Sequence, residues 1–179
     1  MRYAQIRSMD ISNGEGVGVS LFVQGCDRHC FNCFNSETWD FNGGKEWTEE
    51  AKNKFMELID RPISVLGGEP LAEQNLDEVL SLIKEIRNSF PNKTIWLYTG
   101  YKFEQIKDAF IESKKWLQAS WKHSAIIRWE IISNVDVLVD GEYIDEQKDL
   151  TLKWCGSRNQ HVIDVKQSIA QNKMVLYCD

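Results

Sequence analysis

The stretch Val19-Ser20-Leu21-Phe22-Val23-Gln24-Gly25-Cys26 joins an almost continuous apolar run, Val19 to Val23, to a glycine and the first of three closely spaced cysteines. Three similar runs follow along the chain, at Ile63 to Leu66, Thr94 to Tyr98 and Val135 to Val139. Short runs that are rich in β-branched or aromatic residues and nearly free of polar ones are typical of strands buried on both faces. We therefore predict four buried strands.

Helix signals separate most of these runs. Thr48 can cap a helix that has two glutamates in its first turn and apolar residues on one face. Asn75 and Glu78 have the spacing of a capping box and precede apolar residues at helical period. A third helix is predicted over Phe103 to Leu117, whereas Gln118 to Ser133 shows no clean period.

Strands that alternate with helices pair in parallel through right-handed crossovers. The sequence therefore predicts the α/β class, with a mostly parallel sheet that is open or only partly closed as a barrel. Two runs near the carboxyl end, Val162 to Val165 and Met174 to Tyr177, are expected to be late edge strands or caps on the sheet.

Glycines follow the predicted strands directly or almost directly: Gly25, Gly67-Gly68, Gly100 and Gly141. In parallel α/β folds the carboxyl edge of the sheet is where ligands bind. The cysteine-rich segment follows the first of these glycines, so the sequence pattern and the predicted architecture indicate the same site.

The composition excludes several classes of protein. A chain of 179 residues that is 42% hydrophobic suits one compact domain, here residues 1–179. A formal charge of −6 argues against sequence-independent binding of nucleic acid, because the average surface repels the phosphate backbone. The first ten residues do not resemble a signal peptide, and no apolar run is long enough to cross a membrane. We expect a cytoplasmic protein with no nucleic-acid or membrane partner.

The segment Gln24 to Asn35 spaces Cys26, Cys30 and Cys33 as Cys-x3-Cys-x2-Cys, so three thiolates can reach one small site. Such crowding is a poor layout for disulfides in a reducing cytosol and favours metal or cluster ligation. Three ligands leave one iron of a four-iron cluster without a protein donor. An open iron can bind a substrate, as an open position on a catalytic metal does.

Two other sites are compatible with these cysteines. A structural zinc site could use His29 as a nitrogen ligand, although Cys155 and Cys178 do not form the usual second ligand pair. An electron-transfer cluster could use Cys155 as its fourth ligand. Lone cysteines of this kind are more often small apolar packing residues than ligands.

The cysteine spacing resembles that of radical S-adenosylmethionine enzymes, and Gly67-Gly68-Glu69-Pro70 after the second strand looks like their second common motif. Within that superfamily the chain is most similar to the anaerobic (class III) ribonucleotide reductase activating proteins. The likeness spans most of the chain through the runs Asp10 to Gly16, Leu21 to Cys26, Cys33 to Asn35, Thr38-Trp39, Thr99 to Tyr101, Val137 to Gly141, Gly156-Ser157 and Asn159-Gln160.

This resemblance implies a single radical S-adenosylmethionine domain with a partial, open β/α barrel. It implies a 4Fe-4S cluster on Cys26, Cys30 and Cys33, with S-adenosylmethionine chelating the open iron. One electron would then cleave the cofactor to methionine and a 5′-deoxyadenosyl radical, which abstracts hydrogen from a glycine of the reductase. A low-potential donor such as flavodoxin would supply that electron.

The cofactor-binding residues that the resemblance implies are Asn32, Cys33, Phe34, Gly67, Gly68, Glu69 and Asp140. Phe34 can equally be an ordinary core residue. The two glycines can form a plain strand-to-helix turn. Glu69 would accept a hydrogen bond from the methionine ammonium or be a solvated turn residue, and Asp140 would contact the cofactor or cap the following turn.

Three functions remain distinguishable by experiment. The first is activation of anaerobic ribonucleotide reductase, and the second is activation of another glycyl-radical enzyme such as pyruvate formate-lyase, whose activator has a run like Thr38-Trp39-Asp40. The third belongs to a different class, a non-catalytic iron-sulfur or zinc module. The glycine-rich run Gly14 to Gly18 precedes a strand rather than a helix, so it has no nucleotide-binding geometry and is better suited to flank the opening of the site.

Overall fold

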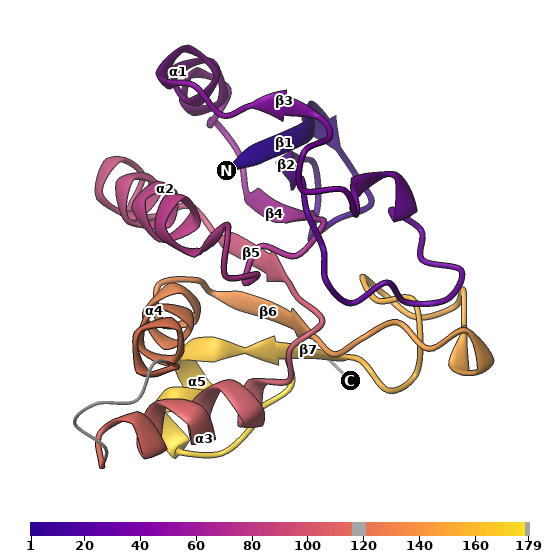
Figure 1. The fold of residues 1–179 in the computed structure, drawn as a ribbon, viewed down its shortest axis with the longest axis vertical. Coiled ribbons are helices and arrows are strands. Elements are labelled where there is room, and N and C mark those ends of the chain that lie inside the picture. The colour runs from indigo at the N-terminus through magenta and orange to yellow at the C-terminus, as the bar shows by residue number, and fades with distance from the viewer. Residues whose placement is uncertain (116–120, 178–179) are drawn as a thin grey trace.

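The computed structural model describes residues 1–115 and 121–177. Within these residues the chain forms a seven-stranded sheet of order β3-β1-β2-β4-β5-β6-β7 and five α-helices (Figure 1). The strands are β1 Arg2–Asp10, β2 Gly18–Val23, β3 Lys45–Glu46, β4 Ile63–Gly67, β5 Ile95–Tyr98, β6 Val137–Asp140 and β7 His161–Asp164. The helices are α1 Glu49–Glu57, α2 Leu76–Ser89, α3 Phe103–Ser113, α4 Lys122–Ser133 and α5 Val165–Gln171.

The four predicted buried strands are confirmed as β2, β4, β5 and β6, and they pair in parallel in that order. The sheet is open, with short β3 at one edge and β7 at the other. β1 and β3 were not predicted, and β1 pairs antiparallel with β2. The late run at Val162 is confirmed as an antiparallel edge strand, whereas the run at Met174 contributes one isolated bridge, from Leu176 to Ile163.

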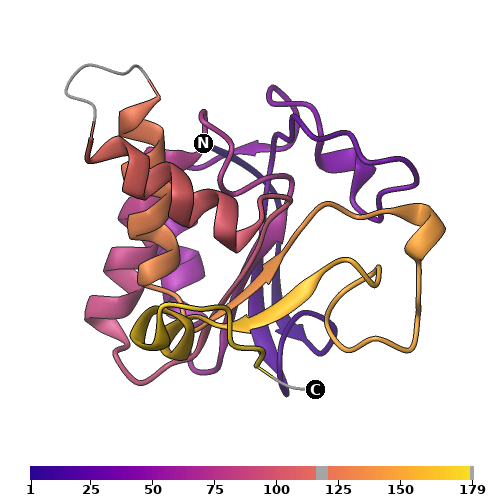
Figure 2. The same cartoon turned by 90° about the horizontal axis from the view of Figure 1, so that it is seen from below.

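The two faces of the sheet have different coverings. The helices gather on one side of it, and two long loops, residues 24–44 and 141–160, lie on the other (Figure 2). Val19, Leu21 and Val23 pack into the large core beneath the helices. Phe22, between them in β2, lines a cavity on the loop side. Because side chains alternate along a strand, one set builds the core and the other remains available to a ligand.

The predicted helix starts were correct in position, but one of the two predicted caps was wrong. The Thr48 hydroxyl accepts a hydrogen bond from the Ala51 amide at 3.2 Å, as predicted. Asn75 makes no side-chain cap. Its buried amide nitrogen instead donates to the carbonyls of Gln24, at 3.1 Å, and Glu69, at 3.0 Å. The side chain satisfies two carbonyls at the ends of β2 and β4, so it is not free to form a capping box.

The third and fourth helices differ from the pattern in the sequence. α3 ends at Ser113, earlier than the predicted Leu117, which lies outside the described residues. The segment without a clean period contains α4, which has almost no amphipathic character because it packs against α2, α3 and α5. None of the helices in the described parts of the chain is long and apolar enough to cross a membrane.

Asp136, directly before β6, connects α2, β5 and α5. Its carboxylate accepts hydrogen bonds from the Arg87 guanidinium at 2.7 Å and the Ile95 amide at 2.8 Å, and pairs with Lys166 at 2.5 Å. Burial alone would raise the pKa of this carboxyl group. The hydrogen bonds from Arg87, Lys166 and Ile95 outweigh burial and hold the pKa below its usual value of 3.8.

We predict that Asp136→Asn lowers the free energy of unfolding by about 1–3 kcal/mol at pH 7, because Arg87 loses its charged partner. A depressed pKa stabilises the folded state above about pH 3.8, and this contribution is lost as the pH falls further. The difference between the wild type and the variant should therefore narrow in acid. Urea unfolding at several pH values measures it, and a difference that stays constant down to pH 3 would contradict the assignment.

Candidate functional site

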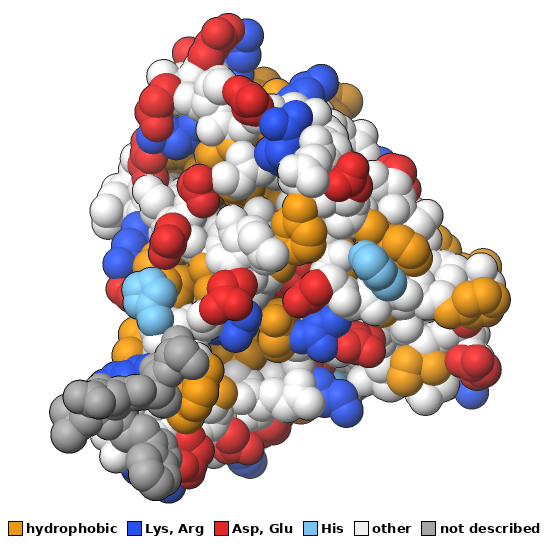
Figure 3. Space-filling model, viewed as in Figure 1, with side chains coloured by type: hydrophobic (Ala, Val, Ile, Leu, Met, Phe, Trp, Pro, Cys, Tyr) orange, Lys and Arg blue, Asp and Glu red, His pale blue; other side chains and the backbone are white. Residues whose placement is uncertain are grey.

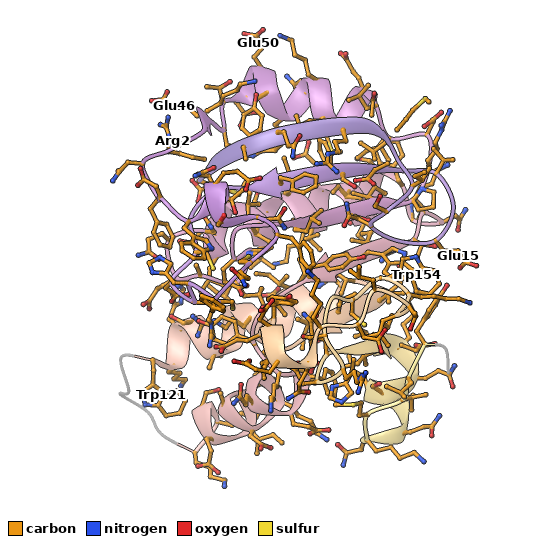
Figure 4. The ribbon with its side chains drawn as sticks, turned by 90° about the vertical axis from the view of Figure 1, so that its right-hand side faces the viewer. Arg2, Glu15, Glu46, Glu50, Trp121 and Trp154 are labelled. Atoms are coloured by element: carbon orange, nitrogen blue, oxygen red, sulfur yellow. The ribbon has the colours of Figure 1, made fainter. Side chains whose placement is uncertain are left out.

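A cavity of about 730 Å³ lies on the helix-free face, over the carboxyl ends of the parallel strands. Its volume is in the range of cofactor-binding pockets. Figure 4 views the molecule from this side. The walls come from β2, β4, β5 and β6 and from both long loops. Sequence-predicted residues in the lining are Cys26, Cys30, Cys33, Phe34, Gly67, Gly68 and Glu69.

The cysteine loop, residues 24–35, is anchored to Thr38 and Trp39 before it turns over the cavity. The amide of Gly25 donates to the Thr38 carbonyl at 2.7 Å, and that of Cys26 donates to the Trp39 carbonyl at 3.0 Å. Cys26 is buried at the end of this anchored stretch, while Cys30 and Cys33 are half-buried. The loop thus places Cys26, Cys30 and Cys33 in the lining of one cavity.

Two non-glycine residues between the cysteines adopt positive φ angles, His29 at 48° and Asn32 at 55°. This conformation is uncommon outside glycine, although asparagine and histidine tolerate it best. The His29 ring stacks on Trp39 with centroids 4.7 Å apart. The Asn32 amide donates to the Asp145 carboxylate at 3.0 Å. Each turn of the loop is therefore held by a partner from another segment.

Burial keeps the Cys26 and Cys30 thiols protonated in the absence of a metal. Burial raises the pKa of Cys26 to about 11 and also raises that of Cys30. Both are neutral thiols at pH 7 until a metal displaces the proton. In residues 1–115 and 121–177, no three His, Cys, Asp or Glu side chains approach closely enough to hold a single ion. Three soft thiolate donors around a roomy cavity fit an iron-sulfur cluster, whose irons occupy separate corners.

Gly67 and Gly68 bring β4 directly against the cysteine loop. Gly67 has φ of 105°, and a Cβ on Gly68 would lie 2.4 Å from the carbonyl oxygen of Gly25. The amide of Gly68 donates to the Val23 carbonyl at 2.9 Å, and that of Glu69 donates to the Gly25 carbonyl at 2.7 Å. The missing side chain at Gly68 therefore permits close contact between two backbones beneath the cavity.

Glu69 is almost fully buried and its carboxylate is well satisfied. One oxygen accepts hydrogen bonds from the Leu71 amide at 2.8 Å and the Thr99 hydroxyl at 2.7 Å. The other accepts from the Gly100 amide at 2.7 Å. Burial raises the pKa of this carboxyl group even though these donors favour the charged form. The side chain ties the end of β4 to the end of β5.

Three other residues predicted to bind the cofactor, Phe34, Asn32 and Asp140, are in different surroundings in the structure. Phe34 lines the cavity but is 57% exposed, and its ring meets that of Tyr143 at 5.2 Å. The Asn32 side chain bonds Asp145 and is not in the lining. Asp140 is fully buried outside the lining, where its carboxylate accepts the Phe103 amide at 2.7 Å and pairs with the His161 ring at 2.9 Å. In this structure Asp140 caps α3 and joins β6 to β7.

Sequence reasoning missed several residues, from both long loops and from β5, that line or close the cavity. The guanidinium of Arg28 donates to Glu142 at 2.7 Å and lies 3.9 Å from the ring centroid of Tyr101. Tyr98 and Trp154 form part of the wall, and Trp154 has φ of 61°. Arg28 and Glu142 are 114 positions apart, so no local pattern connects them. The signals for this side of the site were the glycine after β6 and the resemblance at Gly156-Ser157 and Asn159-Gln160.

We predict that Gly68→Ala lowers the iron content of the reconstituted protein several-fold. The added Cβ would overlap the Gly25 carbonyl, which belongs to backbone and cannot swing away, so the cysteine loop must shift. Iron and sulfide per chain would be measured after anaerobic reconstitution, with far-UV circular dichroism to verify folding. A folded variant with wild-type iron content would show that this close approach does not position the loop.

Comparisons with known proteins agree with this site. The family model of the 4Fe-4S single cluster domain matches residues 12–163. The activating protein of anaerobic ribonucleoside-triphosphate reductase from Salmonella typhimurium is 36% identical over 168 residues, covering 90% of this chain and 97% of the relative. Those of Escherichia coli and Enterobacteria phage T4 are 33% and 34% identical, each over 90% of this chain and over 97% and 93% of the relative. The chain therefore belongs to the family of anaerobic ribonucleoside-triphosphate reductase-activating proteins, which carry a 4Fe-4S cluster domain.

Proposed function

We propose that this protein reductively cleaves S-adenosylmethionine and uses the resulting radical to generate a glycyl radical on anaerobic ribonucleotide reductase. The observation that carries the proposal is that Cys26, Cys30 and Cys33 share one cavity with the Gly67-Gly68-Glu69 turn. A cluster with three protein ligands leaves one iron open beside this turn. Residues 1–179 would then form one radical S-adenosylmethionine domain with a partial, open β/α barrel.

The three cysteines hold the cluster, and when bound the cluster supplies the electron that breaks the sulfur-carbon bond of S-adenosylmethionine. Gly67 and Gly68 leave the strand end without side chains, so the methionine part of the cofactor can approach the backbone. Glu69 fixes Thr99 and Gly100 in the wall and would accept a hydrogen bond from the methionine ammonium. The backbone around Asn32, Cys33 and Phe34 would contact the nucleoside, and Asp140 supports this edge through α3 and β7.

The cavity walls protect a reactive intermediate from water. Phe22, Leu66 and Val139 contribute apolar side chains from β2, β4 and β6, and Trp154 closes the side formed by the 141–160 loop. A radical generated in such a site has few donors of hydrogen other than the substrate that enters it. The walls thus direct the reaction toward the glycine of the partner.

The partner and the electron donor follow from this chemistry. The reductase named in the relatives' descriptions is the proposed target. A low-potential protein such as flavodoxin in the cytoplasm is the proposed source of the electron.

The proposal predicts 5′-deoxyadenosine when the anaerobically reconstituted, reduced protein is given S-adenosylmethionine. Cys26→Ser, Cys30→Ser and Cys33→Ser should each abolish this product and lower the iron content, because each removes a thiolate ligand. Cys155→Ser should keep the wild-type iron content, which tests the alternative of a fourth cysteine ligand. Absence of 5′-deoxyadenosine from a fully loaded wild-type protein would exclude the proposed chemistry.

The choice of partner has its own test. Electron paramagnetic resonance should detect a glycyl radical when anaerobic ribonucleotide reductase is added to the same mixture. Pyruvate formate-lyase serves as the competing substrate in a parallel reaction. A radical formed on pyruvate formate-lyase alone would assign the protein to that enzyme instead.

A further inference from the structure

Large apolar side chains are unusually exposed around the mouth of the cavity. In the described part of the chain, the four most exposed are Leu150 at 79%, Ile11 at 76%, Phe31 at 73% and Met9 at 71%. Those on the helices and their ends are much less exposed, with Leu58 at 37%, Ile169 at 40%, Ile111 at 42% and Trp121 at 44%. The most exposed large apolar side chains therefore lie in β1, in its connection to β2 and in the two long loops, and not on the helices.

These four residues, here called the apolar rim, come from three segments that also line the cavity. Met9 and Ile11 lie in the stretch that contributes Arg7, Ser12 and Asn13 to the wall, and Phe31 lies between the lining residues Cys30 and Cys33. Leu150 belongs to the lining itself. Figure 3 shows hydrophobic side chains at several places on this face, some of them along the right-hand edge, where the cysteine loop and the 141–160 loop lie.

The segments of the rim meet around the cavity although they are distant in sequence. The Tyr177 hydroxyl donates to Glu15, in the connection between β1 and β2, at 2.7 Å, and the Tyr177 ring lies 6.1 Å from that of Trp154. Figure 4 shows Glu15 and Trp154 on the same side of the open face. On the opposite side, the Asn32 bond to Asp145 joins the cysteine loop to the 141–160 loop. These contacts connect the segments that carry the four rim residues.

A border of this kind is what a polypeptide substrate requires. The proposed reaction moves one hydrogen atom from the α-carbon of a glycine to the 5′ carbon of the cofactor fragment, and the unpaired electron passes to the glycine. The glycine must therefore reach the interior of the cavity. The chain on either side of that glycine must cross the mouth, where it covers the surrounding surface. Large apolar patches next to a functional cavity are typical of interaction sites.

We propose that the apolar rim of Met9, Ile11, Phe31 and Leu150 is the docking surface for the glycine-bearing segment of the reductase. This inference rests on the proposed function, since that function requires a polypeptide to enter the cavity. The segment inserts its glycine, which has no side chain to obstruct entry, and places apolar residues from its flanks against the rim. Binding of the segment also seals the cavity mouth against water.

The test separates docking from cofactor chemistry. Ile11→Glu and Met9→Glu place a charge on the rim without altering the cavity wall. Each should raise the reductase concentration that gives half-maximal glycyl-radical signal by about tenfold or more, because a buried apolar contact is replaced by a desolvated charge. The 5′-deoxyadenosine formed by the reduced protein without reductase should stay at the wild-type level.

Ile111→Glu is the matched control, because it places the same charge on an exposed residue of α3, far along the chain from the rim. It should change neither the half-maximal reductase concentration nor the 5′-deoxyadenosine formed without reductase. Iron content and circular dichroism verify each variant, and Ile11→Ala provides a milder substitution if a charged variant fails to fold. Ile11→Ala should then raise the half-maximal reductase concentration by a smaller factor.

The docking proposal would be overturned if folded rim variants needed the same reductase concentration as the wild type for half-maximal glycyl-radical signal. A change in the self-association of the protein alone with normal reductase activation would also overturn it, and would assign the rim to contacts between copies. Absence of 5′-deoxyadenosine from the wild type would instead refute the proposed function itself. The two failures are therefore distinguishable in the same set of measurements.

Discussion

The buried carboxylate of Glu69 and the turn that contains it hold together the ends of three neighbouring strands. Through its backbone amide the residue bonds Gly25 after β2, and through its side chain it bonds Thr99 and Gly100 after β5. A carboxyl group inside a protein is costly to bury unless hydrogen-bond donors surround it. The donors around Glu69 belong to the walls of the cavity, so the hydrogen bonds that satisfy this group also shape the site.

The division of the sheet into two faces explains how a chain of this size can have both a core and a reactive site. One set of alternating side chains packs under the helices, and the other set is divided between the cavity and a second, smaller buried cluster that contains Trp96 and Val137. The buried residues of the large core are therefore not those that line the cavity. The cysteine loop and the 141–160 loop then add the groups that chemistry needs, and polar contacts such as Arg28 with Glu142 connect the two loops.

Much of this arrangement could be predicted from the sequence, because the four central strands are nearly continuous apolar runs that end in glycine. The same pattern placed the three cysteines and Gly67-Gly68 at one edge. β1 was missed because its Arg, Gln, Ser and Asp residues hide the strand period and its pairing with β2 is interrupted by irregularities. The contacts of Asn32 and Asp140 depend on residues 113 and 37 positions away, which no local pattern reveals.

The central claim is that three cysteines hold a four-iron cluster whose remaining iron is open to S-adenosylmethionine. The most direct measurement is the electron paramagnetic resonance spectrum of the reduced, fully loaded protein, recorded before and after S-adenosylmethionine is added. The account predicts that the spectrum of the cluster changes, because the amino and carboxylate groups of the cofactor become ligands of the open iron. A spectrum that is unaltered at saturating S-adenosylmethionine would contradict it.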